Sequence, residues 1–286
     1  LEKIRFKVLI IGVGQLGSRY LQGLASCKMS LEIYAVDPNS ISLDRAKERW
    51  NIISAKQSTH SVYFVKSIES ISGIIDVCIV ASTADVRLSL VEMILQSNQV
   101  RYWILEKVIA QSIEQIERLE QLLGESIGLF VNLPRRIFCW HQLIKNYLPK
   151  NTNWKIFGNG GNWGLACNSI HFIDLIAWWT DEELVSVDTS GLEKWFPSKR
   201  NGFWEVSGKL KMVYSRGSQL ELSVDESNTP FFLILQNEQD SWRLDESVGS
   251  FTNSNGFSLP GKVEFQSELT GPLVDQILKT GKCLLP

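Results

Sequence analysis

The sequence is poor in the residues that build disulfide frameworks and metal sites. Its 286 residues include five cysteines and three histidines. The cysteines are odd in number and scattered, without a C-x-x-C pair, which favours reduced thiols in the cytoplasm and argues against a zinc site. Three histidines do not favour a histidine-rich metal cluster either. We therefore expect no metal in this protein.

The sequence also lacks an excess of positive charge and any long apolar run. It has 29 Lys and Arg residues against 31 Asp and Glu residues, a formal net charge of -2. It therefore lacks the excess of positive charge that is typical of nucleic-acid-binding proteins. No apolar run reaches the length of a membrane span, and charged residues lead directly into the first predicted strand, so we expect no signal peptide. A hydrophobic share of 44% is that of a globular chain, long enough for two domains. We expect a cytoplasmic protein whose substrate is a small molecule, with no nucleic-acid or membrane partner.

One stretch near the amino terminus carries the clearest functional pattern. An apolar run, Lys7–Ile11, leads into Gly12-Val13-Gly14-Gln15-Leu16-Gly17, a G-x-G-x-x-G turn. In such a turn between a strand and a helix, the first glycine allows a tight bend, the second lets the backbone approach a pyrophosphate, and the third lets the helix pack against the strand. The N–H groups and partial positive charge of the helix end favour an anion. We therefore predict dinucleotide binding, rather than a purely structural turn.

A carboxylate follows at the position of a ribose contact. The second apolar run, Leu31–Val36, ends at Asp37, 20 residues after the last glycine, where an acidic residue bonds the adenosine ribose. Asp37 would accept hydrogen bonds from a 2′-hydroxyl and repel a 2′-phosphate. We therefore predict NAD as the cofactor rather than NADP. Arg45 and Lys47 follow on a helix that also carries Asp44, Glu48 and Arg49. They either weaken the preference for NAD or, as we expect, form a solvated face.

The first 132 residues alternate between apolar runs that predict strands and amphipathic segments that predict helices. The predicted strands are Lys7–Ile11, Leu31–Val36, Val62–Val65, Ile74–Ala81, Tyr102–Leu105 and Gly128–Asn132. One predicted helix begins after Gly17. Three others span Ser42–Trp50, Ser82–Gln96 and Glu114–Leu123. This alternation is typical of a doubly wound parallel sheet, so we expect an α/β Rossmann domain over residues 1–132.

Residues 133–286 follow a different pattern, with helices at Arg135–Leu148 and Asn168–Trp179. The predicted strands are Trp154–Phe157, Val206–Tyr214, Gln219–Val224, Phe231–Leu235 and Ser241–Leu244. Gly158–Gly164 and Ser250–Ser258 are expected to be loops, and Ser215–Ser218 a hairpin loop. We expect an α+β domain with an open, mostly antiparallel sheet. Helices would cover one face, and the other, where aromatic residues are frequent, is a candidate contact of a homodimer or homotetramer.

Four motifs, taken in order, resemble those of one family. They are the glycine turn, Glu106-Lys107-Val108 after the fifth strand, Asn132-Leu133-Pro134-Arg135-Arg136 after the sixth, and the segment Cys167–Asp174. The chain resembles the glucose-fructose oxidoreductase, inositol dehydrogenase and rhizopine-catabolism (Gfo/Idh/MocA) family, which carries E-K-P, N-x-x-R-R-like and D-x-x-x-H-x-x-D motifs at these places. The resemblance covers nearly the whole chain. It implies a Rossmann domain, a second α+β domain, and hydride transfer between nicotinamide and a sugar-like substrate.

The sequence departs from the family pattern at four points. Val108 replaces the family's proline. Cys167 stands where dehydrogenases of the family usually carry an aspartate, four residues before His171, so another group must assist His171 or the chemistry differs. The segment between Phe157 and His171 is short for the family, which leaves less loop to shape a substrate pocket. The sequence ends at Pro286, where we expect one more helix.

The resemblance implies that Lys107 and His171 are the catalytic residues. A lysine at the end of a parallel strand can donate to the reacting oxygen and stabilise an alkoxide, and the alternative is a surface ion pair with Glu106. His171 lies in the first turn of its predicted helix, where the helix dipole keeps the imidazole neutral and able to accept a proton. The alternative is a histidine buried in the core. His60 and His141 lack such support, so we expect them to be structural or exposed.

Further residues are assigned to cofactor or substrate by their positions. The expected cofactor contacts are Gly12, Gly14, Gln15, Leu16, Gly17, Asp37, Ser82, Thr83 and Glu106. The expected substrate contacts are Arg136, Asn162, Trp163, Asn168 and Asp174. Alternatives stay open: Arg135 and Arg136 either hold a substrate anion or seal the domain junction, and Trp163 either lines a sugar site or is a packing residue. Arg87 is a further candidate to reach the cofactor or the substrate.

These features predict a NAD-dependent oxidoreductase acting on a secondary alcohol or ketone of a sugar, cyclitol or nucleotide-sugar. Two alternatives stay open. The first, which Cys167 suggests, is that the chain binds a dinucleotide or sugar without net hydride transfer. It would then be a sensor or scaffold, as the galactose-pathway repressor of this superfamily is. In the other alternative, the redox step is internal to a dehydratase, epimerase or glycosidase cycle that regenerates NAD.

Overall fold

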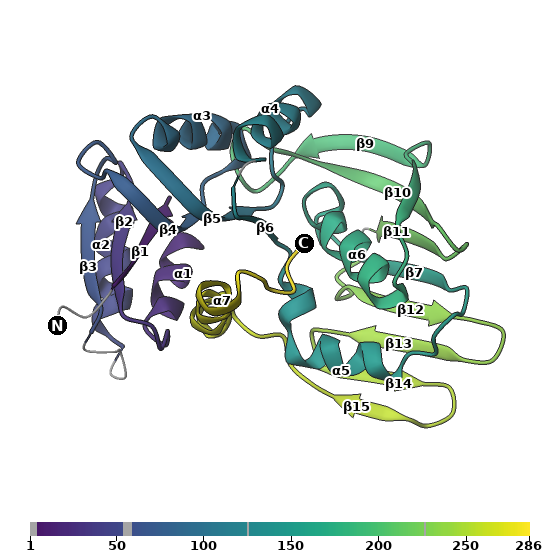
Figure 1. Ribbon diagram of the computed structural model, residues 1–286. Helices are drawn as coiled ribbons and strands as arrows, with labels where there is room; N and C mark the ends of the chain where they lie inside the picture. Colours follow the sequence, from purple (N-terminus) through teal and green to yellow (C-terminus); the bar gives the residue numbers. More distant parts are fainter. Residues whose placement is uncertain (1–4, 54–58, 125, 226) are drawn as a thin grey trace. The chain divides into compact units, whose positions relative to one another are not determined.

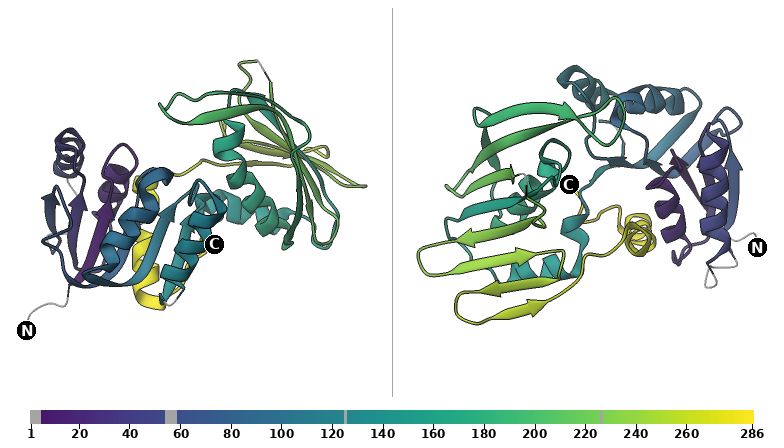
Figure 2. Two further views of the ribbon diagram at one scale, coloured as in Figure 1. Left: turned by 90° about the horizontal axis from the view of Figure 1, so that it is seen from above. Right: turned by 180° about the vertical axis from the view of Figure 1, so that it is seen from behind.

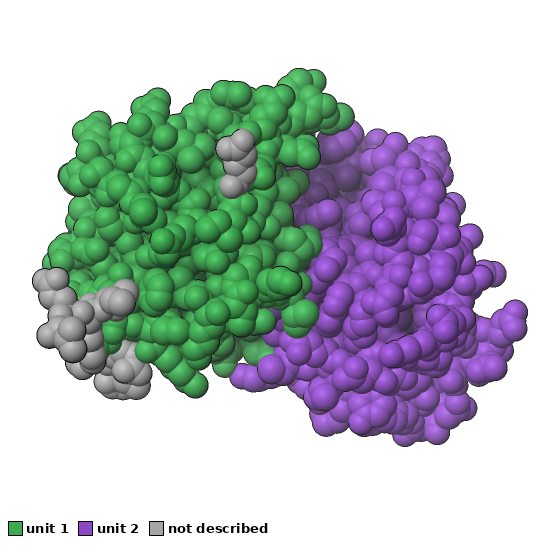
Figure 3. Space-filling model, in the orientation of Figure 1, with its two compact units in different colours: residues 1–133, 264–286 green, residues 134–263 purple. Residues whose placement is uncertain are grey.

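The computed structural model describes residues 5–53, 59–124, 126–225 and 227–286 (Figure 1). The chain divides into two compact units (Figure 3). Unit 1 comprises Leu1–Leu133 and Glu264–Pro286, and unit 2 comprises Pro134–Val263. Each unit holds one β-sheet with its own helices. Within the described ranges, no helix combines the length and the apolar character that crossing a bilayer requires.

Unit 1 is built on a six-stranded parallel sheet in the order β3-β2-β1-β4-β5-β6. Its strands are β1 (Phe6–Ile11), β2 (Leu31–Val36), β3 (Ser61–Val65), β4 (Gly73–Val80), β5 (Asn98–Glu106) and β6 (Gly128–Asn132). The connecting helices are α1 (Gly17–Leu24), α2 (Ser40–Asn51), α3 (Ala84–Leu95) and α4 (Ile113–Leu123). The pair α1 and α2 covers one face of the sheet and the pair α3 and α4 the other (Figure 2). The predicted doubly wound Rossmann fold is confirmed.

The strand order reverses between β1 and β4, which are neighbours in the sheet although they are far apart in the sequence. Residues 8–11 of β1 and 75–80 of β4 are all buried, because helices cover both faces of the sheet. The crossovers that leave these two strands run to opposite faces. The carboxyl ends of β1 and β4 therefore form the edge at which doubly wound folds bind ligands.

A helix that the sequence analysis did not predict completes unit 1. This helix, α7 (Gln266–Thr280), packs on α1 so closely that a Cβ on Gly271 would lie 2.7 Å from Gly23 O. By its contacts the carboxy-terminal segment belongs to unit 1, which differs from the expected assignment of residues 133–286 to one domain. Sequence analysis did not predict this helix, which contains Pro272, because a proline normally ends a helix.

Unit 2 is built on a nine-stranded mixed sheet in the order β15-β14-β13-β12-β7-β11-β10-β8, with β9 also paired to β10. Its strands are β7 (Lys155–Gly161), β8 (Leu184–Asp188), β9 (Leu192–Pro197), β10 (Trp204–Tyr214), β11 (Gln219–Asp225), β12 (Phe232–Gln236), β13 (Ser241–Asp245), β14 (Ser250–Asn253) and β15 (Ser258–Pro260). β7 and β11 pair in parallel and the other neighbours antiparallel. The predicted mostly antiparallel sheet and the hairpin between β10 and β11 are confirmed.

Two segments that we expected to be loops are partly strands. β7 runs through the first part of the expected loop 158–164, and its glycines allow neighbouring backbone to approach. A Cβ on Gly160 would lie 2.7 Å from Phe231 Cα, and one on Gly161 would lie 1.6 Å from Ser227 O. β14 and β15 likewise extend into the expected loop 250–258 and pair with each other. The loop predictions were wrong because glycine in a strand also marks close backbone packing.

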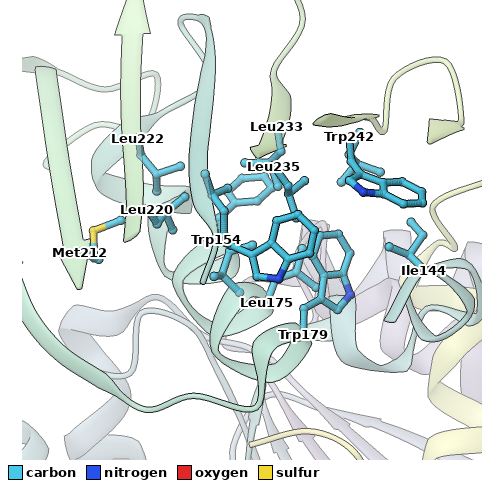
Figure 4. Packing of buried hydrophobic residues seen from close by; sticks show 14 of the residues in the cluster. Ile144, Trp154, Leu175, Trp179, Met212, Leu220, Leu222, Leu233, Leu235 and Trp242 are labelled. Atoms are coloured by element: carbon cyan, nitrogen blue, oxygen red, sulfur yellow. The ribbon is translucent and has the colours of Figure 1, made fainter. Parts of the chain in front are cut away.

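Helices cover one face of the unit 2 sheet. They are the 3₁₀ turn η1 (Pro134–Ile137), α5 (Cys139–Tyr147) and α6 (Leu165–Thr180). Figure 4 shows the core that they form with the sheet, where the buried side chains include Ile144, Trp154, Leu175, Trp179, Leu222 and Leu235. Removing these apolar surfaces from water is what holds the helices on the sheet, at roughly 25 cal/mol per Å².

The other face of this sheet is polar over β10 and β11. Lys209 and Lys211 pair with Glu221 at 3.3 and 3.8 Å. Trp195 and Trp204 are 57% and 58% exposed, but they lie on β9 and at the start of β10. The open face thus carries ion pairs over β10 and β11, whereas Trp195 pairs with Val206, a residue of the core on the helix-covered side. A subunit contact on this face stays a prediction.

Candidate functional site

The three glycines of the turn after β1 differ in what surrounds them. Gly12 has a φ of +84°, and a Cβ there would lie 3.0 Å from Ser82 N. A Cβ on Gly17 would lie 1.8 Å from Gly12 O. By contrast, a Cβ on Gly14 would meet no described atom within 4 Å. The fold itself requires Gly12 and Gly17, whereas Gly14 borders open space at the start of α1, where dinucleotide folds hold a pyrophosphate.

An arginine from α2 is hydrogen-bonded to this turn. Arg49 donates through Nη1 to Gln15 O at 2.8 Å and to Ser18 Oγ at 2.5 Å, and through Nη2 to Gln15 Oε1 at 2.8 Å. Ser18 Oγ donates in turn to Gly14 O at 2.6 Å. Sequence analysis counted Arg49 only among the charges of its helix, and it missed these hydrogen bonds because they join α2 to the glycine turn and the start of α1. Leu16, at the helix N-cap, has no side-chain oxygen to cap α1, as suits an anion-binding helix start.

The other predicted cofactor residues lie along the same edge of the sheet. Asp37 follows β2, the strand next to β1; it is 8% exposed, and its Oδ1 accepts a hydrogen bond from Asn39 N at 2.9 Å. Ser82 and Thr83 follow β4, the neighbour of β1 on its other side. The structure therefore brings the glycine turn, Asp37, Ser82 and Thr83 together at the carboxyl ends of three adjacent strands. This is the arrangement that a dinucleotide requires.

Glu106 lies inside unit 1 instead. It is 5% exposed, and its Oε1 accepts hydrogen bonds from Tyr20 Oη and, at 2.7 Å, from Asn132 Nδ2. Burial raises the pKa of Glu106, and these two hydrogen bonds oppose the shift. Where we expected a cofactor contact, the buried carboxylate thus has protein partners. Lys107 itself is partly exposed, directly after β5.

Unit 2 holds a cavity of about 370 Å³ beside α6. It is lined by Arg135, Trp163, Asn168, His171, Phe172, Phe231, Glu246 and Ser247. Three predicted site residues, Trp163, Asn168 and His171, are brought together here, and Asn168 Nδ2 donates to Trp163 O at 2.7 Å. Asn162 lines a different hollow, beside Asp225. The structure thus separates Asn162 from the other predicted substrate residues of this segment.

Aromatic rings form one side of the cavity. The rings of Phe172 and Phe231 stack with centroids 4.2 Å apart, and that of Trp163 lies 4.5 Å from Phe231. The indole Nε1 of Trp163 donates to Ser223 O at 2.8 Å, and the Arg135 guanidinium lies 4.3 Å from the Phe172 ring centroid. Trp163 is therefore both a packing residue and a lining residue. An aromatic surface beside charged groups suits a ligand with an apolar ring face and polar edges.

Sequence reasoning missed the ion pair in this cavity. Arg135 donates through Nε and Nη2 to the two oxygens of Glu246, at 2.9 and 2.7 Å, and His141 Nε2 lies 2.9 Å from Glu246 Oε1. Burial alone would raise the pKa of Glu246, but Arg135 and His141 outweigh it and lower the pKa to about 2. His141 is fully buried and stacks on Trp179 at 5.3 Å. Glu246 follows β13, 111 residues after Arg135, and no motif marks it.

The predicted substrate residues Arg136 and Asp174 bind each other. Arg136 donates through Nε and Nη2 to the Asp174 carboxylate at 2.8 and 2.5 Å. Burial raises the pKa of Asp174, and the Arg136 guanidinium opposes that shift. Neither residue lines the cavity around His171. Their pair joins η1 to α6 one helical turn beyond His171, which fixes the helix rather than offering a binding group.

His171 lies in the second turn of α6, and the argument from the helix dipole was wrong. The helix begins at Leu165, because Glu205 Oε2 accepts a hydrogen bond from Ala166 N at 2.9 Å and so caps it earlier than predicted. The field of a helix end falls off within its first turn. What places His171 at a candidate site is therefore the cavity that it lines.

Cys167 is exposed on α6, one turn before His171. In the part of the chain that the structure describes, no group of three or more His, Cys, Asp or Glu side chains is placed to hold a metal ion. The carboxylate that shares the cavity with His171 is Glu246.

Comparisons with known proteins identify the fold. No protein-family profile and no curated protein matches the sequence. The solved UDP-N-acetylglucosamine 3-dehydrogenase GnnA from Acidithiobacillus ferrooxidans is similar with a TM-score of 0.72 at 12% identity, over 99% of this chain and 92% of that chain. An oxidoreductase from Agrobacterium radiobacter in complex with NAD+, L-tartaric acid and magnesium has a TM-score of 0.70 at 14% identity, over 97% and 90%. The super-repressor mutant of Gal80p from Saccharomyces cerevisiae has a TM-score of 0.67 at 14% identity, over 99% and 87%. The chain therefore shares the fold of these proteins along nearly its whole length.

Proposed function

We propose that this chain is a NAD-dependent oxidoreductase acting on a secondary alcohol or ketone of a sugar, cyclitol or nucleotide-sugar. The observation that carries the proposal is the open space at Gly14, beside two glycines that the fold itself needs. A purely structural turn has no need of a glycine where a side chain would fit, whereas a pyrophosphate does. Asp37 supports NAD over NADP, because a carboxylate repels a 2′-phosphate. A dehydrogenase and a NAD+-bound oxidoreductase share the fold.

The proposed chemistry needs a hydride carrier, a proton acceptor and groups that bind the substrate. Bound nicotinamide would supply the hydride acceptor or donor. When an alcohol is oxidised, its hydroxyl proton must also leave, and we assign Lys107 to stabilise the alkoxide and His171 to accept the proton. In the cavity of unit 2, Arg135 would donate hydrogen bonds to substrate hydroxyls and Glu246 would accept them.

The cofactor assignment is tested on the purified protein. Nucleotide released by denaturation is identified by mass, and the emptied protein is titrated with NAD and with NADP. We expect NAD to bind at least about tenfold more tightly, because burying a phosphate near a carboxylate costs at least about 1.4 kcal/mol. Equal or tighter NADP binding would overturn the choice of NAD, and no binding of either would overturn the proposal.

Lys107→Ala tests the catalytic assignment. Turnover is followed by nicotinamide absorbance with D-glucose, myo-inositol and UDP-N-acetylglucosamine. We expect the variant to keep its NAD affinity within about twofold and to lose at least about 100-fold in turnover, because a donor to a developing alkoxide acts in the transition state. Lys66→Ala, an exposed lysine of the same unit, is the control and should change neither. Parallel loss of affinity and turnover would make Lys107 a cofactor or folding residue.

A sensor is the second candidate, and the exposed Cys167 favours it. The fold also occurs in a repressor protein, and Cys167 leaves α6 without the family's aspartate. Hydride transfer by the unmodified chain would exclude this candidate. Activity that appears only in Cys167→Asp would support it. Tightly held NAD, with turnover that needs no added cofactor, would instead point to an internal redox cycle.

A further inference from the structure

Arg87 on α3 is almost completely buried, with 1% of its surface exposed. Its Nη2 donates to Ser82 O at 2.6 Å, and its Nη1 donates to Ile109 O at 2.8 Å and also to Val108 O. Ser82 follows β4, whereas Val108 and Ile109 follow β5. A single guanidinium thus joins the segments that leave two neighbouring strands at the edge of the sheet where the cofactor is expected.

A carboxylate compensates the buried charge. Burial lowers the pKa of Arg87, and the nearby Glu106 carboxylate opposes that shift. Glu106 is in turn held by Tyr20 and Asn132. A charge buried away from water is costly unless it is paired and hydrogen-bonded. Each of the two charged side chains is hydrogen-bonded to its own partners, so each holds the surrounding backbone in one position.

We propose that Arg87 is a positioning residue for Lys107. The proposal rests on the proposed function, in which Lys107 contacts the reacting oxygen. Lys107 stands between Glu106, whose side chain is held by Tyr20, and Val108, whose carbonyl accepts from Arg87. The backbone is therefore fixed on both sides of the lysine. The bond to Ser82 O ties the same guanidinium to a segment expected to contact the cofactor.

Arg87 acts through the backbone and does not contact a ligand itself. Sequence analysis had considered it as a residue that reaches cofactor or substrate. Its burial and its three carbonyl acceptors commit the guanidinium to the protein. Lysine cannot replace it fully, because a single ammonium lacks the planar fork that reaches several acceptors at once.

The test compares Arg87→Lys and Arg87→Met with Arg118→Lys. Arg118 lies on α4, pairs with Glu92 of α3 and is half exposed, so it is a matched control on the same helix pair. We measure the melting temperature, the Kd for NAD, kcat and KM with whichever of D-glucose, myo-inositol and UDP-N-acetylglucosamine the wild type uses, and amide hydrogen exchange over residues 106–110.

For Arg87→Lys we expect a folded protein, NAD affinity within about twofold, an unchanged KM and a kcat about 10- to 100-fold lower, since a misplaced catalytic group costs about that much. Exchange over residues 106–110 should become faster, and more so in Arg87→Met, in which kcat should fall further. Arg118→Lys should match the wild type. Unchanged kcat and exchange in Arg87→Lys would overturn the proposal, as would a parallel loss of NAD affinity and kcat. A wild type without any hydride transfer overturns the proposed function itself, whatever the exchange data show.

Discussion

The two units build their candidate sites in different ways. In unit 1 the site is a set of backbone positions: glycines at a turn and residues at the ends of adjacent parallel strands. In unit 2 it is a cavity whose walls are side chains from η1, α6, the segment after β13 and the segments just before α6 and β12, held by ion pairs between residues far apart in the chain. The first kind of site depends on local sequence and can be recognised from it. The second depends on tertiary contacts that leave no local pattern.

The largest expected effect separates two glycines within the same turn. Gly17→Ala should destabilise the protein by about 5 kcal/mol or prevent folding, because its Cβ would lie 1.8 Å from Gly12 O. Gly14→Ala should leave stability within about 0.5 kcal/mol, since its Cβ meets no described atom within 4 Å. It should nevertheless weaken NAD binding. Thermal unfolding and NAD titration check both variants. A stable Gly14→Ala that binds NAD normally would contradict the predicted pyrophosphate site at this turn.

Most of unit 1 could be predicted from the sequence because its signals are local. β6 was predicted at Gly128–Asn132 and is found there, and Asp37 lies at the end of β2 as the spacing requires. The contacts of Arg49 and Glu106 could not be predicted, since each joins elements that only the fold brings together. α7 was missed because its packing on α1 outweighs the propensity of Pro272 to end a helix.

The next effect concerns the ion pair of the unit 2 cavity. Arg135→Met should destabilise the protein by about 3 to 4 kcal/mol, because it leaves the Glu246 carboxylate buried without its main partner; the two side chains are 15% and 16% exposed. Arg118→Met, which breaks a pair that is half exposed, should cost less than about 1 kcal/mol. Urea unfolding measures both. Similar losses in the two variants would mean that the cavity pair is no more than a surface ion pair.

The substrate side of the site was predicted less well than the cofactor side. Trp163, Asn168 and His171 do line one cavity, and the family resemblance supplied that grouping. Glu246 was missed because nothing near β13 marks it as functional, and its importance comes only from its contacts with Arg135 and His141. Arg136 was assigned to substrate because a sequence motif does not reveal whether an arginine already has a protein partner.

The contribution of the Glu246 carboxylate to the free energy of unfolding should depend on pH. Its pKa is lowered from 4.5 to about 2 in the folded protein, so its contribution to stability is present above about pH 4.5 and is lost as the pH falls towards 2. The difference between wild type and Glu246→Gln should therefore shrink over that range, by on the order of 2 to 3 kcal/mol. Unfolding free energies of both proteins between pH 6 and 2 measure it. A constant difference would show that the carboxylate does not titrate as its partners require.

The smallest effect distinguishes two asparagines that sequence analysis had grouped together. Asn168→Ala removes the hydrogen bond to Trp163 O and a lining group of the cavity, and should raise the substrate KM by about fivefold, the equivalent of about 1 kcal/mol. Asn162→Gly should leave KM unchanged, because Asn162 lines a different hollow. Glycine is the suitable replacement because Asn162 has a φ of +50°, which alanine would disfavour. Equal effects on KM would mean that the substrate extends beyond the cavity around His171, and a larger effect of Asn162→Gly would move the substrate site to the hollow beside Asp225.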